Sequence, residues 1–122
     1  MISETSAEAG VALWTGITDA DSDGDPVISF VWDPAALKRV PRANIVRGTA
    51  AGVVVQSEGI TLEKDEALLV VGRRLSFDPK TTRVVTAQGE CWDVETTPRV
   101  RRSFAAGTLT SARLKRSAAV IP

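Results

Sequence analysis

The sequence predicts an all-β fold, either a small antiparallel barrel or a sandwich of about six to eight strands, with at most one short helix. Two observations lead to this prediction. Short runs rich in β-branched and aromatic residues are separated by turn residues along the chain. Residues 68–94 are the clearest case, because an Asp-Pro turn and a Gln-Gly pair divide them into three apolar runs. Closure into a barrel would hide the edge strands, which otherwise invite pairing with other chains.

Length and composition indicate one folded domain, a single β domain over residues 1–122. The chain is 43% apolar and 25% charged, and its 122 residues are enough to bury a core. Residues 1–10 are small and polar, which predicts a flexible N-terminal arm. No apolar stretch approaches the roughly 20 residues that cross a bilayer, so no membrane partner is expected. The lone Cys91 cannot form an internal disulfide, which favours a reducing compartment.

The first third of the chain predicts two strands, residues 11–18 and 27–32, with an Asp-rich loop between them. In the second strand Ile28, Phe30 and Trp32 share one face at period two, so that face is expected to be buried.

The next segment begins with Asp33-Pro34, which is typical of a helix start, and Pro41 limits that helix to one or two turns. Residues 44–56 suit two short strands or one bent strand, because Gly48 and Gly52 interrupt a β-branched run. Residues 57–66 are a charged connection.

Residues 68–94 follow and predict a β-meander, in which successive strands pair antiparallel. Residues 68–77 predict one strand, and Asp78-Pro79 predicts the turn after it. If Gln88-Gly89 is a two-residue hairpin loop, Val85 lies opposite Trp92 on the face that Val94 also occupies. Val85, Trp92 and Val94 are therefore the predicted core. Residues 98–107 predict a basic loop, and residues 108–115 predict the last strand, whose second part also suits a short helix.

Charge is distributed unevenly although the net charge is zero. Residues 1–33 carry no base, and their acids are Glu4, Glu8, Asp19, Asp21, Asp23, Asp25 and Asp33. Residues 98–122 carry no acid, and their bases are Arg99, Arg101, Arg102, Arg113, Lys115 and Arg116. Either both ends are simply solvated, or the basic surface of one copy meets the acidic surface of the next, favouring head-to-tail association.

Catalytic motifs are absent from the sequence. There is no histidine, which removes the commonest general base and metal ligand and excludes the usual Ser-His and Cys-His arrangements. The glycines are scattered singly and form no phosphate-binding loop. Cys91 is expected on the strand face opposite Trp92, as a small residue filling a gap. We therefore expect no catalytic residue and no cofactor.

Asp19, Asp21, Asp23 and Gly24 match the start of a calcium-binding loop. The twelfth position of such a loop, normally a bidentate Glu, is Phe30. A solvated hairpin loop is the favoured interpretation, and Asp19, Asp21 and Asp23 remain a weak metal candidate.

Arg99, Arg101 and Arg102 surround Val100 in the predicted basic loop. The guanidinium fork suits carboxylate and phosphate partners. Three interpretations stay open: a solvated loop, contact with an acidic neighbouring subunit, and contact with nucleic acid.

The segment from Phe77 to Val94 combines the Asp-Pro turn, an Arg-Val-Val strand and the run Gly-Glu-Cys-Trp-Asp-Val. It resembles small head-to-tail joining proteins of tailed bacteriophages, which carry a similar Gly-x-x-Trp/Tyr-x-Val hairpin in their second half. Those proteins continue with a loop and a last strand rich in Leu, Thr and Arg, as in residues 108–114 here. The resemblance covers residues 67–116.

The resemblance implies a stopper or head-completion protein. Such proteins are β-barrels that form a homo-oligomeric ring between the portal or adaptor of the DNA-filled head and the tail, and they hold the packaged DNA. It implies portal, adaptor and tail proteins as partners, non-specific contact with DNA, and a place in the virion after assembly in the host cytoplasm.

We therefore expect a non-enzymatic structural protein of the phage neck. Val85, Trp92 and Val94 would hold the fold, while Arg99, Arg101 and Arg102 would contact a neighbour or DNA. The alternatives are a capsid decoration protein or tail terminator and, from another class, a metal-dependent or ligand-binding β-barrel using the Asp-rich loop. A single-strand-binding barrel is disfavoured, because three Trp, three Phe and no Tyr leave few aromatic platforms for stacking.

Overall fold

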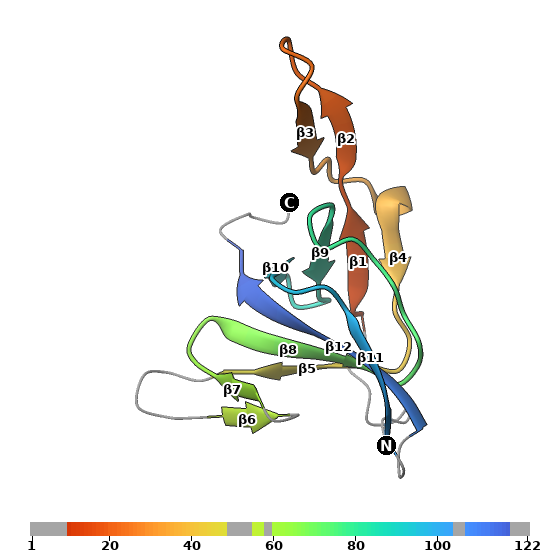
Figure 1. Ribbon diagram of the computed structural model, residues 1–122, viewed down its shortest axis with the longest axis vertical. Coiled ribbons are helices and arrows are strands. Elements are labelled where there is room, and N and C mark those ends of the chain that lie inside the picture. Colours follow the sequence, from red (N-terminus) through yellow and green to blue (C-terminus); the bar gives the residue numbers. More distant parts are fainter. Residues whose placement is uncertain (1–9, 49–54, 58–59, 104–106, 118–122) are drawn as a thin grey trace.

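The computed structural model describes residues 10–48, 55–57, 60–103 and 107–117, and the regular secondary structure of these residues is almost entirely β-strand. The predicted arm, residues 1–10, lies outside them except for Gly10. The main sheet has eight antiparallel strands, and seven follow the path β4-β1-β9-β10-β12-β8-β5, while β11 also pairs with β12 (Figure 1). Its strands are β1 (Ala12–Thr15), β4 (Leu37–Arg39), β5 (Ala43–Arg47), β8 (Glu66–Val71), β9 (Thr82–Val85), β10 (Cys91–Val94), β11 (Arg99–Ser103) and β12 (Gly107–Arg116).

Two small hairpins accompany the main sheet, one of β2 (Ile17–Ala20) with β3 (Pro26–Ser29) and one of β6 (Val55–Ser57) with β7 (Ile60–Leu62). The path of the main sheet ends at β4 and β5, so the described strands form an open, sandwich-like arrangement and not a closed barrel. The prediction of an all-β fold is thus confirmed in its sandwich form. No helix of the described residues is long and apolar enough to cross a membrane.

The longest strand, β12, organises the sheet. Its first half pairs with β11 from Gly107 to Ser111, and its second half pairs with β10 from Leu114 to Arg116. Its other edge pairs with β8 from Thr110 to Lys115. Because both edges of β12 are occupied, its backbone hydrogen bonds join the meander to the middle of the chain.

The main core lies on one face of this sheet. Trp92 (3% exposed) and Leu114 (fully buried) contribute to it, and strands β1, β5, β8, β9, β10 and β12 all supply side chains. Its members are Val11, Leu13, Val40, Ala43, Ile45, Ala67, Leu69, Val71, Leu75, Val84, Trp92, Val94, Ala112 and Leu114. The alternating burial of β12 follows from the period of two that a strand imposes.

Two smaller apolar clusters cover the opposite face. Trp14 contacts Phe30 and Trp32 edge to face, with ring centroids 5.3 Å apart in both pairs. The indole Nε1 of Trp14 donates to the Val31 carbonyl oxygen at 3.1 Å, which holds residues 30–32 on the sheet. The other cluster gathers Leu62 from β7 with residues of β8 and β12. Ile28, Phe30 and Trp32, whose shared face was predicted to be buried, are only half-buried.

The predicted pairing of Val85 with Trp92 is wrong by one residue. The pairs are Val84 with Trp92 and Val85 with Cys91. The Thr86 amide donates to the Glu90 carbonyl at 3.1 Å, which leaves residues 87–89 as a three-residue loop instead of the expected two. Gly89 has φ of +85°, the left-handed conformation that such a loop requires near its end.

This shift divides the predicted core between the two faces of the sheet. Trp92 and Val94 lie in the main core, while Val85 is buried on the other face with Cys91, Ala12 and Trp14. Cys91 does lie opposite to Trp92, as predicted, and it is buried. Burial raises the pKa of the Cys91 thiol, which disfavours the reactive thiolate.

Several element boundaries also differ from the prediction. The expected strand over residues 11–18 is two strands, because Gly16 separates β1 from β2, and a Cβ there would lie 2.7 Å from Ile28 Cγ2. The helix expected after Asp33 is one 3-10 turn, η1 (Pro34–Ala36), followed at once by β4. The run over residues 68–77 leaves strand geometry after Val71, although Leu75 still reaches the core.

Other expectations are confirmed. For residues 44–56 the two-strand alternative holds, with β5 (Ala43–Arg47) and β6 (Val55–Ser57), although residues 49–54 lie outside the described part. At the Asp78-Pro79 turn, the Asp78 side chain accepts a hydrogen bond from the Lys80 amide at 2.9 Å. The last strand forms as β12, and no part of its described residues is helical.

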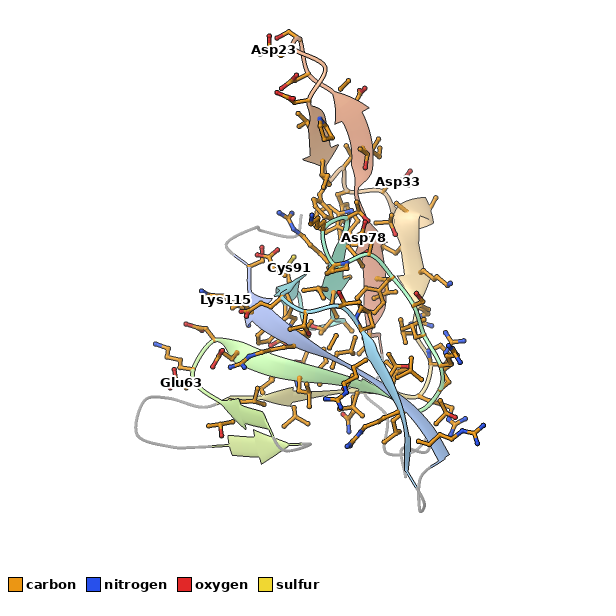
Figure 2. The ribbon with its side chains drawn as sticks, viewed as in Figure 1. Asp23, Asp33, Glu63, Asp78, Cys91 and Lys115 are labelled. Carbon is orange, nitrogen blue, oxygen red and sulfur yellow. The ribbon has the colours of Figure 1, made fainter. Side chains whose placement is uncertain are left out.

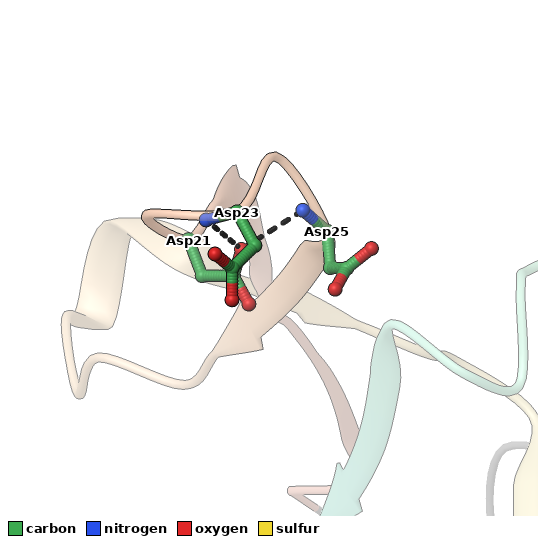
Figure 3. Close-up of side chains that lie close together, drawn as sticks. All are labelled: Asp21, Asp23 and Asp25. Atoms are coloured by element: carbon green, nitrogen blue, oxygen red, sulfur yellow. Dashed lines mark hydrogen bonds between the residues drawn. The ribbon is translucent and has the colours of Figure 1, made fainter.

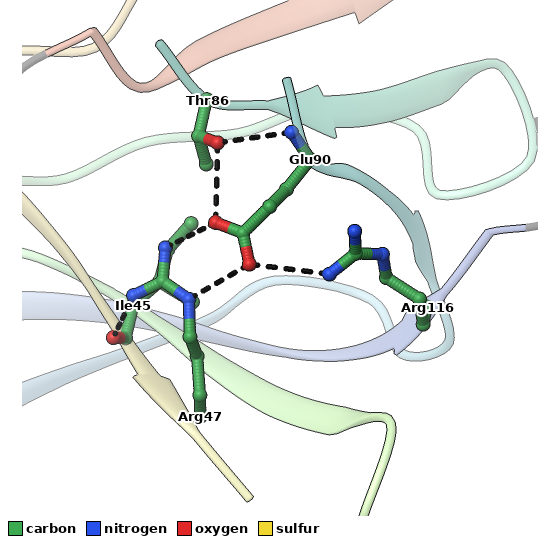
Figure 4. A network of polar contacts seen from close by, with 5 residues as sticks. All are labelled: Ile45, Arg47, Thr86, Glu90 and Arg116. Atoms are coloured by element: carbon green, nitrogen blue, oxygen red, sulfur yellow. Dashed lines mark hydrogen bonds and ion pairs between the residues drawn. The ribbon is translucent and has the colours of Figure 1, made fainter. Parts of the chain in front are cut away.

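A polar network ties the β9–β10 loop to distant strands (Figure 4). Glu90 accepts hydrogen bonds from Arg47 Nε of β5 at 3.0 Å and from Arg116 Nη1 of β12 at 3.2 Å. Thr86 Oγ1 also donates to Glu90 at 3.2 Å. The hydrogen bonds from Arg47 hold the pKa of the Glu90 carboxyl below its ordinary value, and this effect exceeds the opposing effect of burial.

We predict that Trp92→Ala lowers the free energy of unfolding by about 3–5 kcal/mol, the range for truncating a large buried aromatic side chain. Urea denaturation followed by circular dichroism measures the change. Val31→Ala is the control, because Val31 is 57% exposed and its loss should change stability by about 0.5 kcal/mol or less. A loss below about 1 kcal/mol for Trp92→Ala would contradict its place in the core.

The Glu90 network predicts a pH-dependent contribution to stability. Because the pKa is lowered in the folded state, the stabilisation is present above the ordinary glutamate pKa of about 4.3 and is lost as pH falls through the folded value. The wild type should exceed Glu90→Gln in stability at pH 7, and the gap should close on acidification. Glu95→Gln, at an exposed site, should follow the wild type throughout. A gap that stays constant from pH 7 to pH 3 would refute the prediction.

Candidate functional site

An arginine-lined groove lies between β11, the start of β12 and the segment that follows β8. We call it the arginine groove. Its volume is about 520 Å³, and its lining residues are Arg73, Arg74, Val100, Arg101, Arg102 and Thr108. In Figure 2, nitrogen-tipped side chains gather over this end of β11 and β12. Four of the lining residues are arginines, which makes this surface electropositive and suited to carboxylates or phosphates.

Thr110 of β12 positions one wall of the arginine groove. Its side chain is buried, and its hydroxyl donates to the Arg73 carbonyl oxygen at 2.7 Å and accepts from the Leu75 amide at 2.9 Å. The Gly72 amide also donates to the Arg42 carbonyl at 2.9 Å. These hydrogen bonds hold Arg73 and Arg74 beside β12 where β8 has already ended.

Strand β11 forms the other wall. It pairs with β12 through Val100 opposite Thr110, Arg101 opposite Leu109 and Arg102 opposite Thr108. Successive side chains of a strand point to opposite faces, so the basic residues flank both faces of β11. The predicted basic loop over residues 98–107 is therefore a strand from Arg99 to Ser103, because β12 continues past β10 and supplies a pairing edge, and residues 104–106 lie outside the described part.

Three arginines of the groove, Arg73, Arg74 and Arg102, differ in their ion pairing from four arginines elsewhere in the chain. Arg47, Arg83, Arg113 and Arg116 each form an ion pair with a carboxylate. Within the described residues, no ion pair involves Arg73, Arg74 or Arg102. Arg73 Nε is buried and has no hydrogen-bond partner there. Within the part of the chain that the structure describes, Arg73, Arg74 and Arg102 therefore bring positive charge to the groove without a carboxylate beside them.

The sequence pointed to only part of this site. Arg101 and Arg102 line the groove, and Arg99 lies on the same strand but outside the lining. Sequence reasoning missed Arg73 and Arg74, because residues 68–77 were predicted to be one continuous strand. A pair of charged residues directly after Gly72, interrupting an apolar run, was the signal that β8 had ended.

The second charged feature is the tip of the β2–β3 hairpin (Figure 3). The carboxylates of Asp21, Asp23 and Asp25 lie within 4.8 Å of one another, and all three residues are exposed. Asp19 lies outside this group, and its side chain accepts from the Ala20 amide at 2.8 Å. The structure therefore gathers a different trio from the Asp19, Asp21 and Asp23 of the weak metal candidate.

The geometry of this tip has a local explanation. Asp21 Oδ1 accepts hydrogen bonds from the Asp23 and Asp25 amides, each at 2.9 Å, and Gly24 adopts φ of +84°. An Asp side chain that bonds the backbone two residues on is a common turn device. Calcium takes six to eight oxygen ligands, and three exposed carboxylates on one hairpin turn enclose no such site.

The two charged features lie at opposite ends of the molecule. Asp23 marks one end of the long axis in Figure 2, and β11 with the start of β12 lies at the other end. The acidic tip and the arginine groove are therefore separated along the length of the molecule, although its net charge is zero.

Comparison with known proteins yields no match, whether to a protein-family model, to a curated protein or to a solved structure.

We predict that Thr110→Val destabilises the chain by about 1–3 kcal/mol, because the Leu75 amide and the Arg73 carbonyl lose their partner. In Thr110→Val, the Leu75 amide should exchange its hydrogen faster than in the wild type. The midpoint of urea denaturation should also fall. Thr108→Val is the matched control on the same strand, and it should change stability by about 0.5 kcal/mol or less. Equal effects of the two variants would rule out this role for Thr110.

Proposed function

We propose that this chain is a structural assembly protein of the neck of a tailed bacteriophage, forming part of a homo-oligomeric ring between the portal or adaptor of the head and the tail. The observation that carries the proposal is the charge separation. An exposed acidic hairpin lies at one end of the β framework and the arginine groove lies at the other. Such a molecule suits repeated contact between identical subunits.

The hairpin resemblance supports the same assignment. The β9–β10 hairpin and β12 lie within the segment that resembles head-to-tail joining proteins, and they form the centre of the main sheet. The arginine groove belongs to the same segment. Guanidinium groups also bind phosphates, so the groove supports a secondary role in retaining packaged DNA by non-specific contact.

A small metal-dependent or ligand-binding protein has weaker support. The exposed carboxylates of Asp21, Asp23 and Asp25 adopt an arrangement that backbone hydrogen bonds explain. Cys91 is buried, and its pKa is raised, so it makes a poor nucleophile.

Gold-labelled antibody against the purified chain tests the proposal on virions of the phage that encodes it. We expect label at one vertex, between head and tail, and untailed heads that lose DNA when the coding sequence is disrupted. Label over the whole shell would identify a decoration protein, and label on a free tail end would identify a tail terminator. Either of these results, or virions without label, would overturn the neck assignment.

A further inference from the structure

We propose that the β2–β3 hairpin of one copy docks in the arginine groove of the next copy. The inference rests on the proposed function, because it names the contact through which the subunits would associate. The partner is thus a second copy of this chain, bound through carboxylates and an apolar flank.

The hairpin has few contacts that would hold it in an isolated chain. Strands β2 and β3 form their own two-stranded sheet, and the hairpin projects from the main sheet (Figure 1). A two-stranded hairpin is at best marginally stable in water without a surface to pack on. All four residues of β2 are exposed. A neighbouring surface would supply the missing contacts.

The hairpin also carries exposed apolar side chains. Ile17 is 60% exposed, Val27 is 43% exposed, and Val31, just beyond β3, is 57% exposed. Ile17 pairs with Ser29, and Asp19 pairs with Val27, so Ile17 and Val27 lie on the same face of the hairpin. An apolar flank below an acidic tip is a combination that favours a protein partner over solvent.

The arginine groove offers the complementary combination. Its guanidinium groups match the carboxylates of Asp21, Asp23 and Asp25. It also contains Val100, an exposed aliphatic residue at 37%, which provides an apolar contact for the flank of the hairpin. The match is therefore one of charge and of apolar surface together.

The position of the two features excludes docking within one chain. The tip and the groove lie at opposite ends of the long axis, so the hairpin meets a groove only on another copy. Such a contact uses different surfaces on its two sides. It generates a ring when the rotation between copies closes and a filament when it does not. A net charge of zero means that copies do not repel one another as a whole.

Sedimentation velocity of the full chain at low ionic strength tests the inference with two neutralised variants. The tip variant is Asp23→Asn with Asp25→Asn, and it keeps Asp21, whose side chain holds the turn. The groove variant is Arg74→Gln with Arg102→Gln, two exposed residues. The matched controls are Glu95→Gln and Lys38→Gln, at exposed positions directly after β10 and on β4.

We expect the wild type and both controls to self-associate, and each double variant to associate at least about tenfold more weakly, with association falling as salt rises. A mixture of the two double variants should form a one-to-one dimer and nothing larger. In that pair the intact hairpin of the groove variant meets the intact groove of the tip variant, and no other intact contact remains. Circular dichroism confirms that every variant is folded.

Other outcomes overturn the inference. If the wild type and both double variants assemble alike, the contact between subunits lies elsewhere. The neck assignment is tested separately, by antibody labelling. If only the groove variant is impaired, or the groove binds duplex DNA while the chain stays monomeric, the occupant of the groove is not the hairpin. A wild type that remains monomeric at low salt and high concentration also refutes the contact.

Discussion

The pairing of β12 along both of its edges is the constraint on which the rest of the structure depends. Its second half holds β10 and its first half holds β11, while β8 occupies the opposite edge. One strand thus joins the meander, the middle of the chain and the C-terminal region through backbone hydrogen bonds, and its inward side chains enter the main core. Loss of this register would move every core side chain of β12 to the opposite face.

The same strand positions the arginine groove. Thr110 faces the segment after β8 and anchors it by two hydrogen bonds, and Thr108 lines the groove itself. The groove therefore depends on the interior of the sheet and is not an independent surface loop. At the β9–β10 hairpin, Glu90 forms ion pairs with Arg47 and Arg116, so these two arginines are compensated within the sheet.

Opposite charges at the two ends give the molecule a direction. The acidic tip concentrates like charges within 4.8 Å, and a basic partner would relieve their repulsion. The arginine groove gathers positive charges in the same way. Since the two features lie at opposite ends of one chain, we propose that their complementarity acts between molecules, in an assembly role.

Short-range patterns in the sequence were sufficient for the all-β class, the Asp78-Pro79 turn, the Asp-rich hairpin and the burial of Trp92, because alternation and turn chemistry act over a few residues. The same patterns could not determine which residue pairs with Trp92. A two-residue and a three-residue loop ending at Gly89 are both compatible with this sequence, and they differ by one residue in strand register. Nor could the sequence reveal that residues 99–103 become a strand or that Arg73 and Arg74 lie beside them. Those outcomes depend on how far β12 extends past β10, and on Thr110 meeting a backbone segment more than thirty residues away, which are properties of the packed sheet.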